Sequence, residues 1–131
     1  VDLDATSPLR KASDVTKAME QFLEGDSSNL VTVCKAKKNP YFNMIEKRNG
    51  QYKIVKEMET PIIRRQDAPE IFEMNASIYI WKRSNLLANQ GIINENTDCY
   101  IMPEDRSIDI DSESDFKYVE YILNNRNKRN Q

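Results

Sequence analysis

The run Leu30-Val31-Thr32-Val33-Cys34 decides the fold class. An apolar, β-branched run of this kind is typical of a strand that is buried on both faces of a sheet. Residues 1–5 predict an earlier strand, and apolar residues at helical spacing predict a helix between the two strands. Ser13 or Asp14 is the expected N-cap of this helix, and Gly25 its C-terminal end. Strand, helix and strand in this order indicate a crossover connection and a parallel sheet.

The next segment has a different character. Asn49-Gly50 separates residues 41–45 from residues 51–55, which predicts a β-hairpin with a tight turn. Residues 56–73 are highly charged, contain two prolines and are poor in core residues. We therefore expect this stretch to lie on the surface or to reach toward a partner.

The last third of the chain returns to core-forming patterns. Strands are predicted at residues 77–81 and 99–102, with a short helix at residues 84–89. A final helix is expected after Ser112, because Ser112-x-x-Asp115 resembles a capping box. The predicted inner face of this helix consists of Phe116, Val119, Ile122 and Leu123.

Composition narrows the class of protein. A length of 131 residues fits one domain, and 39% hydrophobic residues allow a modest core. The 19 basic and 21 acidic residues give a net charge of −2, which offers no argument for a nucleic acid as partner. The basic cluster at residues 126–129 is expected to be a solvated helix end. Histidine is absent, which excludes Ser-His-Asp and Cys-His catalysis and histidine metal sites within this sequence.

Cysteine usage and hydropathy address location. Cys34 and Cys99 lie far apart, without metal spacing or a CxxC pair, and a buried, reduced Cys34 suits a cytoplasmic protein. No stretch predicts a signal peptide or a membrane span, so no membrane is expected as partner. The chain starts with the strand-like Val1-Asp2-Leu3-Asp4-Ala5 and without Met, so we expect a piece of a longer protein that is entered in mid-sheet.

Asp109 and Asp111 are the strongest candidates for chemistry. Residues two apart in an extended segment point to the same side, about 6–7 Å apart between Cα atoms, while Ile108 and Ile110 would enter the core. Two such anions repel one another unless a proton or cation lies between them. Mg²⁺ bound by one or two carboxylates and by substrate phosphates is the usual solution. From spacing alone, a solvated strand end with a helix cap is the more frequent alternative.

Four segments together resemble the cytidylyltransferases that make CMP-sialic acid and related CMP-activated nonulosonic acids. Each segment alone is weak, but their order and spacing are specific and they span nearly the whole chain. The segments are Leu3-Asp4-Ala5-Thr6-Ser7-Pro8-Leu9-Arg10, Arg64-Arg65-Gln66-Asp67, Asn75-Ala76-Ser77-Ile78-Tyr79-Ile80, and Arg106-Ser107-Ile108-Asp109-Ile110-Asp111 with Asp115-Phe116.

The resemblance implies an α/β fold with a doubly wound, mostly parallel sheet of the nucleotide-diphospho-sugar transferase type. Residues 1–131 would form the C-terminal part of a single cytidylyltransferase domain, with a β-hairpin dimerisation arm at residues 41–75. The implied reaction transfers CMP from CTP to the anomeric hydroxyl of a nine-carbon sialic-acid-like sugar and releases pyrophosphate. It implies Mg²⁺ as cofactor and a homodimer in which the partner's arm completes the sugar site.

The resemblance also implies roles for single residues. Asp109 and Asp111 would be the catalytic, metal-binding pair. Arg65 would hold the carboxylate of the sugar acid, for which a guanidinium fork is suited, and Tyr79 would form a wall for the N-acyl group. The other residues implied in substrate binding are Asp4 at the sugar end, Thr6 and Ser7 in the loop that faces the nucleotide, Asn75 on the strand beside the sugar, and Ile92 and Ile93 near the pocket.

Two features depart from the family pattern. Asp4 stands where the sialic acid enzymes commonly have Gln, which keeps legionaminate, pseudaminate and similar sugars open beside N-acetylneuraminate. The glycine-rich, basic loop that binds CTP in the family has no match, because the three glycines of this chain are isolated. The N-terminal nucleotide-binding part is therefore expected to be missing, and the fragment alone is expected to be inactive.

Other interpretations stay open. A related cytidylyltransferase that uses Kdo shares the fold and the metal chemistry. A non-catalytic dimerisation or interaction fragment is the alternative from another class. Taken singly, Arg64-Arg65 fits a surface charge pair, Tyr79 a core tyrosine, and Ile92-Ile93 simple core packing.

Overall fold

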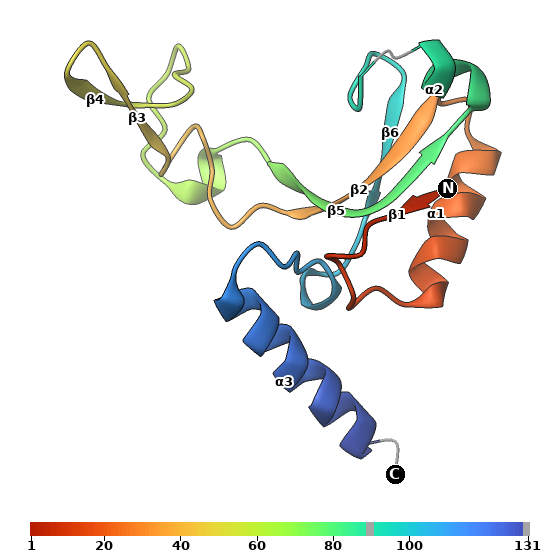
Figure 1. Ribbon diagram of the computed structural model, residues 1–131. Helices are drawn as coiled ribbons and strands as arrows, with labels where there is room; N and C mark the ends of the chain where they lie inside the picture. The colour runs from red at the N-terminus through yellow and green to blue at the C-terminus, as the bar shows by residue number, and fades with distance from the viewer. Residues whose placement is uncertain (89–90, 130–131) are drawn as a thin grey trace. The chain divides into compact units, whose positions relative to one another are not determined.

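The computed structural model describes the backbone of residues 1–88 and 91–129 (Figure 1). Within these ranges, the burial of side chains is described up to residue 126. The chain divides into two compact units. The first unit comprises Val1–Cys34 and Met74–Gln131, and the second comprises Lys35–Glu73.

A four-stranded sheet organises the first unit. Its order is β1 (Asp2–Leu3), β5 (Phe72–Trp81), β2 (Asn29–Lys35) and β6 (Thr97–Ile101). β1 pairs antiparallel with β5, and β2 pairs parallel with β6. The buried central strand predicted at residues 30–34 is confirmed, since all five residues are buried in β2.

The sheet is mixed, whereas the sequence predicted a mostly parallel one. The N–H of Lys82 donates to the Ser28 carbonyl, and the N–H of Ile78 donates to Thr32 Oγ1. Because residue numbers rise along β5 as they fall along β2, these two neighbours run in opposite directions. The first two strands are parallel as expected, but β5 lies between them. The α/β class is confirmed.

The first helix, α1 (Ala12–Glu24), packs on this sheet. It begins earlier than predicted, because its N-cap is Lys11 and not Ser13 or Asp14. Asp14 instead occupies the third helical position, where its carboxylate accepts a 2.8 Å hydrogen bond from the Lys11 N–H. The predicted end at Gly25 is confirmed.

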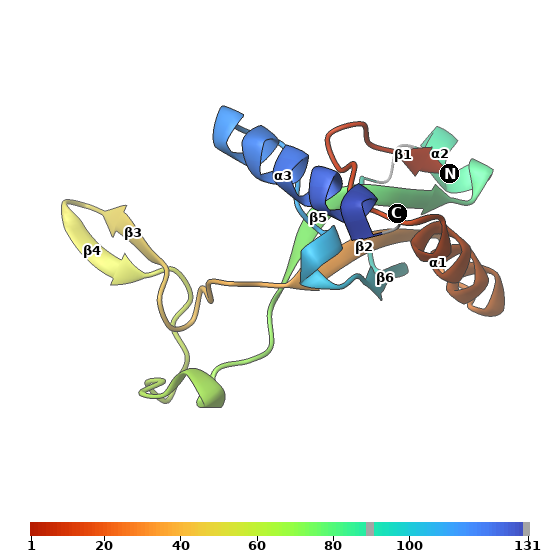
Figure 2. The same ribbon diagram turned by 90° about the horizontal axis from the view of Figure 1, so that it is seen from below.

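The core lies between α1 and one face of the sheet, along which α1 runs in both views (Figures 1 and 2). A cluster of buried apolar side chains forms this core. Because burial of one large apolar side chain contributes about 1.5–3 kcal/mol, the cluster is the main source of stability in the first unit. It contains Ala18, Phe22, Leu30, Ile78, Ile80 and Met102.

The remaining helices agree in part with expectation. The short helix α2 (Arg83–Ala88) is confirmed, with residue 89 outside the described residues. α3 (Glu113–Arg129) starts with the predicted capping box, because Ser112 N–H and Oγ both donate to Asp115 at 2.8 and 2.7 Å. Among the described residues, no helix has the length and apolarity needed to cross a membrane.

The predicted inner face of α3 is correct for only half of its residues. Val119 is buried and Ile122 is half-buried. Phe116 and Leu123 are 54% and 38% exposed. Apolar residues recur on more than one side of α3, so periodicity alone could not single out the side that packs.

The second unit contains the predicted hairpin. β3 (Ile45–Arg48) pairs antiparallel with β4 (Gln51–Ile54). Asn49 and Gly50 have φ values of 51° and 83°, the left-handed conformation that a tight hairpin turn requires. The predicted first strand at residues 41–45 is wrong except at Ile45, because residues 42–44 turn their N–H groups to the Asn39 carbonyl.

Ala76 changes the direction of the side chains in β5. Asn75 and Ile78 are three positions apart and would face opposite sides of a regular strand. Yet the Asn75 side chain bonds to Thr32 Oγ1 at 2.7 Å and to Met102 Sδ at 3.4 Å, and Ile78 belongs to the same buried cluster as Met102. Ala76 has a left-handed φ of 47° between them, so it acts as a bulge that turns Asn75 to the side of Ile78.

We expect substitutions of Ala76 to follow from this conformation. A left-handed residue with a Cβ costs about 1–2 kcal/mol, so Ala76→Gly should raise the free energy of unfolding by about 0.5–1 kcal/mol after its entropic cost. Ala76→Val should lower it by more than about 1 kcal/mol, because a β-branched side chain is strained at positive φ. Urea unfolding of both variants measures this difference, and equal midpoints would contradict the bulge.

Candidate functional site

The loop that follows β1 is tied down by its own side chains. Asp4 Oδ1 accepts hydrogen bonds from the N–H and the Oγ1 of Thr6, at 3.1 and 3.0 Å, which closes an Asx turn. These bonds hold the pKa of Asp4 below its ordinary value. Arg10 Nη1 donates to the carbonyls of Asp4, Ser7 and Ser77, at 2.5, 2.9 and 3.3 Å. The loop is therefore fixed against β5.

The segment that carries Asp109 and Asp111 lies beside this loop. The N–H of Ile110 donates to the Thr6 carbonyl at 2.9 Å. Asp109 is half-buried and accepts a 3.0 Å bond from the same N–H, whereas Asp111 is exposed. The predicted alternation of buried and exposed residues is absent, because residues 107–111 form an irregular segment and Asp109 is as buried as Ile108.

Tyr79 lies among the acidic residues of this region. Burial raises the pKa of Tyr79, and the negative charges of Asp4, Asp109 and Asp2 raise it further. The phenol is therefore neutral at physiological pH and available as a hydrogen-bond donor. The structure thus brings together Asp4, Thr6, Tyr79 and Asp109 from three separate parts of the sequence.

Asn75 lies beneath this region and not in an open pocket. It is 2% exposed. Its Oδ1 accepts from Thr32 Oγ1 at 2.7 Å, and its Nδ2 donates to Ser107 Oγ at 2.9 Å. Because both ends of the amide are bonded within the protein, Asn75 connects β2 and β5 to the start of the Asp109 segment.

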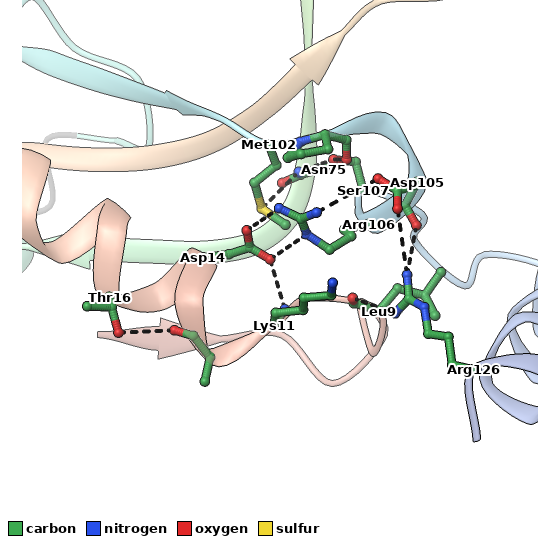
Figure 3. Close-up of polar contacts among 12 residues, drawn as sticks. Leu9, Lys11, Asp14, Thr16, Asn75, Met102, Asp105, Arg106, Ser107 and Arg126 are labelled. Carbon is green, nitrogen blue, oxygen red and sulfur yellow. Dashed lines mark hydrogen bonds and ion pairs between the residues drawn. The ribbon is translucent and has the colours of Figure 1, made fainter. Parts of the chain in front are cut away.

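A buried ion pair holds the turn that precedes this segment (Figure 3). The 3-10 turn η2 (Glu104–Arg106) ends in Arg106, which donates from Nε and Nη2 to the two carboxylate oxygens of Asp14, at 2.8 and 2.7 Å. Asp14 is 1% exposed. This paired, two-point geometry is the strong form of an ion pair and fixes the orientation of both groups.

The last helix holds the same turn from another side. Arg126 Nη1 donates to the Leu9 carbonyl at 3.2 Å, and Arg126 Nη2 lies 3.8 Å from the Asp105 carboxylate. The prediction of a solvated end at residues 126–129 is therefore wrong for Arg126, and the side chains of residues 127–129 lie outside the described residues.

Other predicted site residues lie elsewhere. Ser7 is fully buried, and its Oγ has no hydrogen-bond partner among the described residues. The carbonyl of Ile92 accepts from Asn29 Nδ2 at 2.7 Å, so Ile92 and Ile93 lie near the start of β2, whereas Asn75 and Ser107 lie beyond its middle.

Arg65 belongs to the second unit, at the start of the 3-10 turn η1 (Arg65–Asp67). Its Nη2 donates to the Lys37 carbonyl at 2.7 Å. Together with Lys35 and Asn39 it lines a pocket of about 490 Å³ within this unit. Its side chain is exposed and has further donors that are able to bind an anion.

The metal-binding potential of the first unit rests on two carboxylates. Among the described residues, no cluster of three or more acidic or cysteine side chains forms a closed metal site. The oxygen donors of Asp109 and Asp111 nevertheless fit Mg²⁺, which binds one or two carboxylates and takes its other ligands from water and phosphates.

Sequence reasoning missed Arg10, Arg106 and the role of Asp14. Both arginines stood within the quoted segments, but without a role. The signal for Asp14 was its place at a helix start, which was interpreted as a cap. Its partner Arg106 is 92 positions away, so no local pattern pointed to the pair.

The geometry thus defines an α/β unit with a site of acidic side chains beside an irregular segment. Similarity to known proteins narrows the class of protein further. No protein-family model matches the chain. It is 45% identical over 127 residues to post-translational flagellin modification protein B of Campylobacter coli. It is 48% identical over 127 residues to CMP-N,N'-diacetyllegionaminic acid synthase of Campylobacter jejuni. Each match covers 97% of this chain and 53% of the relative.

A more distant match points the same way. An N-acylneuraminate cytidylyltransferase of Streptococcus agalactiae is 30% identical over 117 residues, which are 89% of this chain and 28% of that protein. The chain is therefore similar, over most of its length, to proteins named as a CMP-N,N'-diacetyllegionaminic acid synthase and as an N-acylneuraminate cytidylyltransferase, as its four segments predicted. It spans about half the length of the first two relatives.

The buried pair predicts a specific pH dependence of stability. Burial raises the pKa of Asp14, but the hydrogen bonds from Arg106 and from the Lys11 N–H outweigh burial, so its pKa lies below the ordinary value. A lowered pKa contributes stability above the unfolded-state pKa of about 3.9, and this contribution is lost as the pH falls through the folded-state pKa.

Asp14→Asn should therefore be less stable than the wild type by about 3–5 kcal/mol at neutral pH, because it leaves Arg106 unpaired. The difference should narrow as the pH falls below about 4. Urea unfolding across this pH range measures both effects. Two curves that stay parallel down to the most acidic pH would contradict the assignment.

Proposed function

We propose that the protein containing this chain transfers CMP from CTP to the anomeric hydroxyl of a nine-carbon nonulosonic acid, with release of pyrophosphate. The observation that carries the proposal is the convergence of Asp4, Tyr79 and Asp109 beside the Thr6 loop. The similarity to a CMP-N,N'-diacetyllegionaminic acid synthase over nearly the whole chain supports it.

In this proposal Asp109 and Asp111 bind Mg²⁺, which neutralises phosphate charge when bound. The chain's own contribution is to hold the two carboxylates in place and to orient the sugar. The neutral hydroxyl of Tyr79 donates a hydrogen bond toward the acyl substituent of the sugar, and Asp4 accepts bonds from its hydroxyl or amide groups. Such positioning lowers the barrier by making the reacting groups meet in the right orientation.

We propose a legionaminate-type sugar as the substrate. The name of the 48% identical relative supports this choice. The Asx turn at Asp4 gives a physical reason for the departure from Gln, because a longer amide side chain does not close the same turn. The sugar end of the site is therefore built differently from that expected for N-acetylneuraminate.

We propose that the second unit serves as the dimerisation arm, and that Arg65 of a second copy of the chain binds the carboxylate of the sugar acid. The exposed apolar side chains of the second unit support a contact with a second copy, since isolated hairpins are marginal in water. The most exposed of them are Ile45, Tyr52 and Ile63, at 63%, 70% and 83%.

We also propose a cytoplasmic location for the protein. The buried Cys34 agrees with this location.

A pyrophosphate-release assay on the complete natural protein tests the proposed reaction. With CTP and Mg²⁺, release should depend on a legionaminate-type acid and be weaker with Kdo. Asp109→Asn and Asp111→Asn should each lower kcat/KM about 100-fold or more, because a metal ligand supports several kcal/mol of transition-state stabilisation. Asp26→Asn is the matched control, since Asp26 is an exposed carboxylate whose one ion pair among the described residues is with Lys82.

Absence of any sugar-dependent release by the complete protein would favour the alternative of a non-catalytic interaction module. Activity of Asp111→Asn close to that of Asp26→Asn would overturn the metal assignment while leaving the reaction intact.

The doubled arginine offers a second matched pair of variants. Arg65→Ala should raise the KM for the sugar acid about tenfold or more with a smaller change in kcat, because it removes a bond to the substrate carboxylate. Arg64→Ala should leave KM near the wild-type value. Steady-state kinetics measure KM and kcat for both variants. Equal increases in KM for Arg65→Ala and Arg64→Ala would show that only surface charge matters.

A further inference from the structure

We propose that Asp14 and Arg106 are positioning residues that set the affinity of Asp109 and Asp111 for the divalent ion. This inference rests on the proposed function. In this inference the buried pair fixes the position of the acidic segment. Neither the residue types nor their spacing in the sequence indicated this role.

Arg106 lies close to Asp109 along the chain. Only Ser107 and Ile108 separate Arg106 from Asp109. Two intervening residues cannot absorb a large displacement, so the position of Arg106 limits where the Asp109 backbone lies.

Several side-chain contacts hold the turn at Arg106 (Figure 3). Arg106 joins it to Asp14 on α1, and Ser107 joins it to Asn75 on β5. Asp105 lies next to Arg126 of α3. After Ser107 the main chain bonds to the Thr6 loop through Ile110. The acidic segment therefore starts from a turn that three elements hold.

The buried ion pair contributes orientation more than net stability. The desolvation of Arg106 and Asp14 offsets much of their attraction, so such a pair adds little net stability compared with neutral or apolar residues of similar size. What it adds is orientation, because a guanidinium and a carboxylate bonded at two points have one preferred arrangement. Asp14 is fixed in turn by the Lys11 N–H at 2.8 Å.

The consequence concerns the metal ion. Two carboxylates that are held in place bind a cation without first losing conformational freedom, whereas a loose segment must be ordered on binding. Supporting residues of this kind typically change metal affinity 10–100-fold. Loss of the pair should therefore weaken divalent-ion binding without removing any ligand.

The experiment separates geometry from stability in the complete natural protein. The double variant Asp14→Asn/Arg106→Gln removes both charges and leaves no unpaired buried ion, so its stability should recover relative to Asp14→Asn alone. Its half-saturating Mg²⁺ concentration for pyrophosphate release and its Kd for Mn²⁺, measured by electron paramagnetic resonance, should both rise at least tenfold. The matched control is Asp26→Asn/Lys82→Gln, which removes an exposed pair of 2.9 Å.

Hydrogen exchange supplies a readout that is independent of activity. Amides of residues 107–111 should exchange at least tenfold faster in the double variant, while those of residues 30–34 keep their wild-type rates. Arg106→Lys keeps the charge but not the two-point geometry, so it should fold normally and still show faster exchange at residues 107–111. This variant decides the question if the double variant does not fold.

Wild-type Mn²⁺ affinity together with wild-type exchange at residues 107–111, in the double variant or in Arg106→Lys, would overturn the proposal. An equal acceleration at residues 30–34 would also overturn it, because the pair would then serve global stability only. If the wild-type protein releases no pyrophosphate with any sugar, the proposed function fails, yet Mn²⁺ binding and exchange still decide the positioning role.

Discussion

The two-point ion pair between Arg106 and the buried Asp14 is the contact on which the arrangement of the first unit depends. It joins the start of α1 to the turn after β6, two places that are 92 positions apart in the sequence. Asn75 also donates to Ser107 at this turn, and Arg126 lies 3.8 Å from the Asp105 carboxylate, so β5 and α3 hold the same turn. Electrostatics therefore organises the region next to a core that apolar packing stabilises.

The local elements were largely predictable because their signals are local. The apolar run at residues 30–34, the Asn49-Gly50 turn and the capping box at Ser112 each act over a few residues, and the structure contains all three. The order of strands was not predictable in the same way. β5 enters between β1 and β2 after a long excursion through the second unit, so the sequence order of the first two strands did not reveal their spacing in the sheet.

The sequence pointed to the acidic members of the candidate site, whose roles stay predictions, but not to the side chains that support them. The resemblance pointed to Asp4, Tyr79 and Asp109, which the structure brings together. The same resemblance treated Asn75 as a substrate contact, but its amide is bonded on both sides within the protein. Hydrogen bonds between distant segments produce no periodic pattern in the sequence. The side chains that support the acidic segment could therefore be identified only from the structure.

The left-handed backbone at Ala76 has a further consequence for how this chain tolerates change in length. β5 continues on both sides of Ala76, and buried and less buried residues alternate only after it, from Ile78 to Trp81. Removal of Ala76 would give an uninterrupted pleat and send Asn75 to the opposite face, away from Thr32 and Ser107. The presence of a residue at position 76 thus matters more than the methyl group of Ala76. A related sequence that lacks one residue at this position would have lost the support of the acidic segment, whereas a sequence without this deletion would keep it.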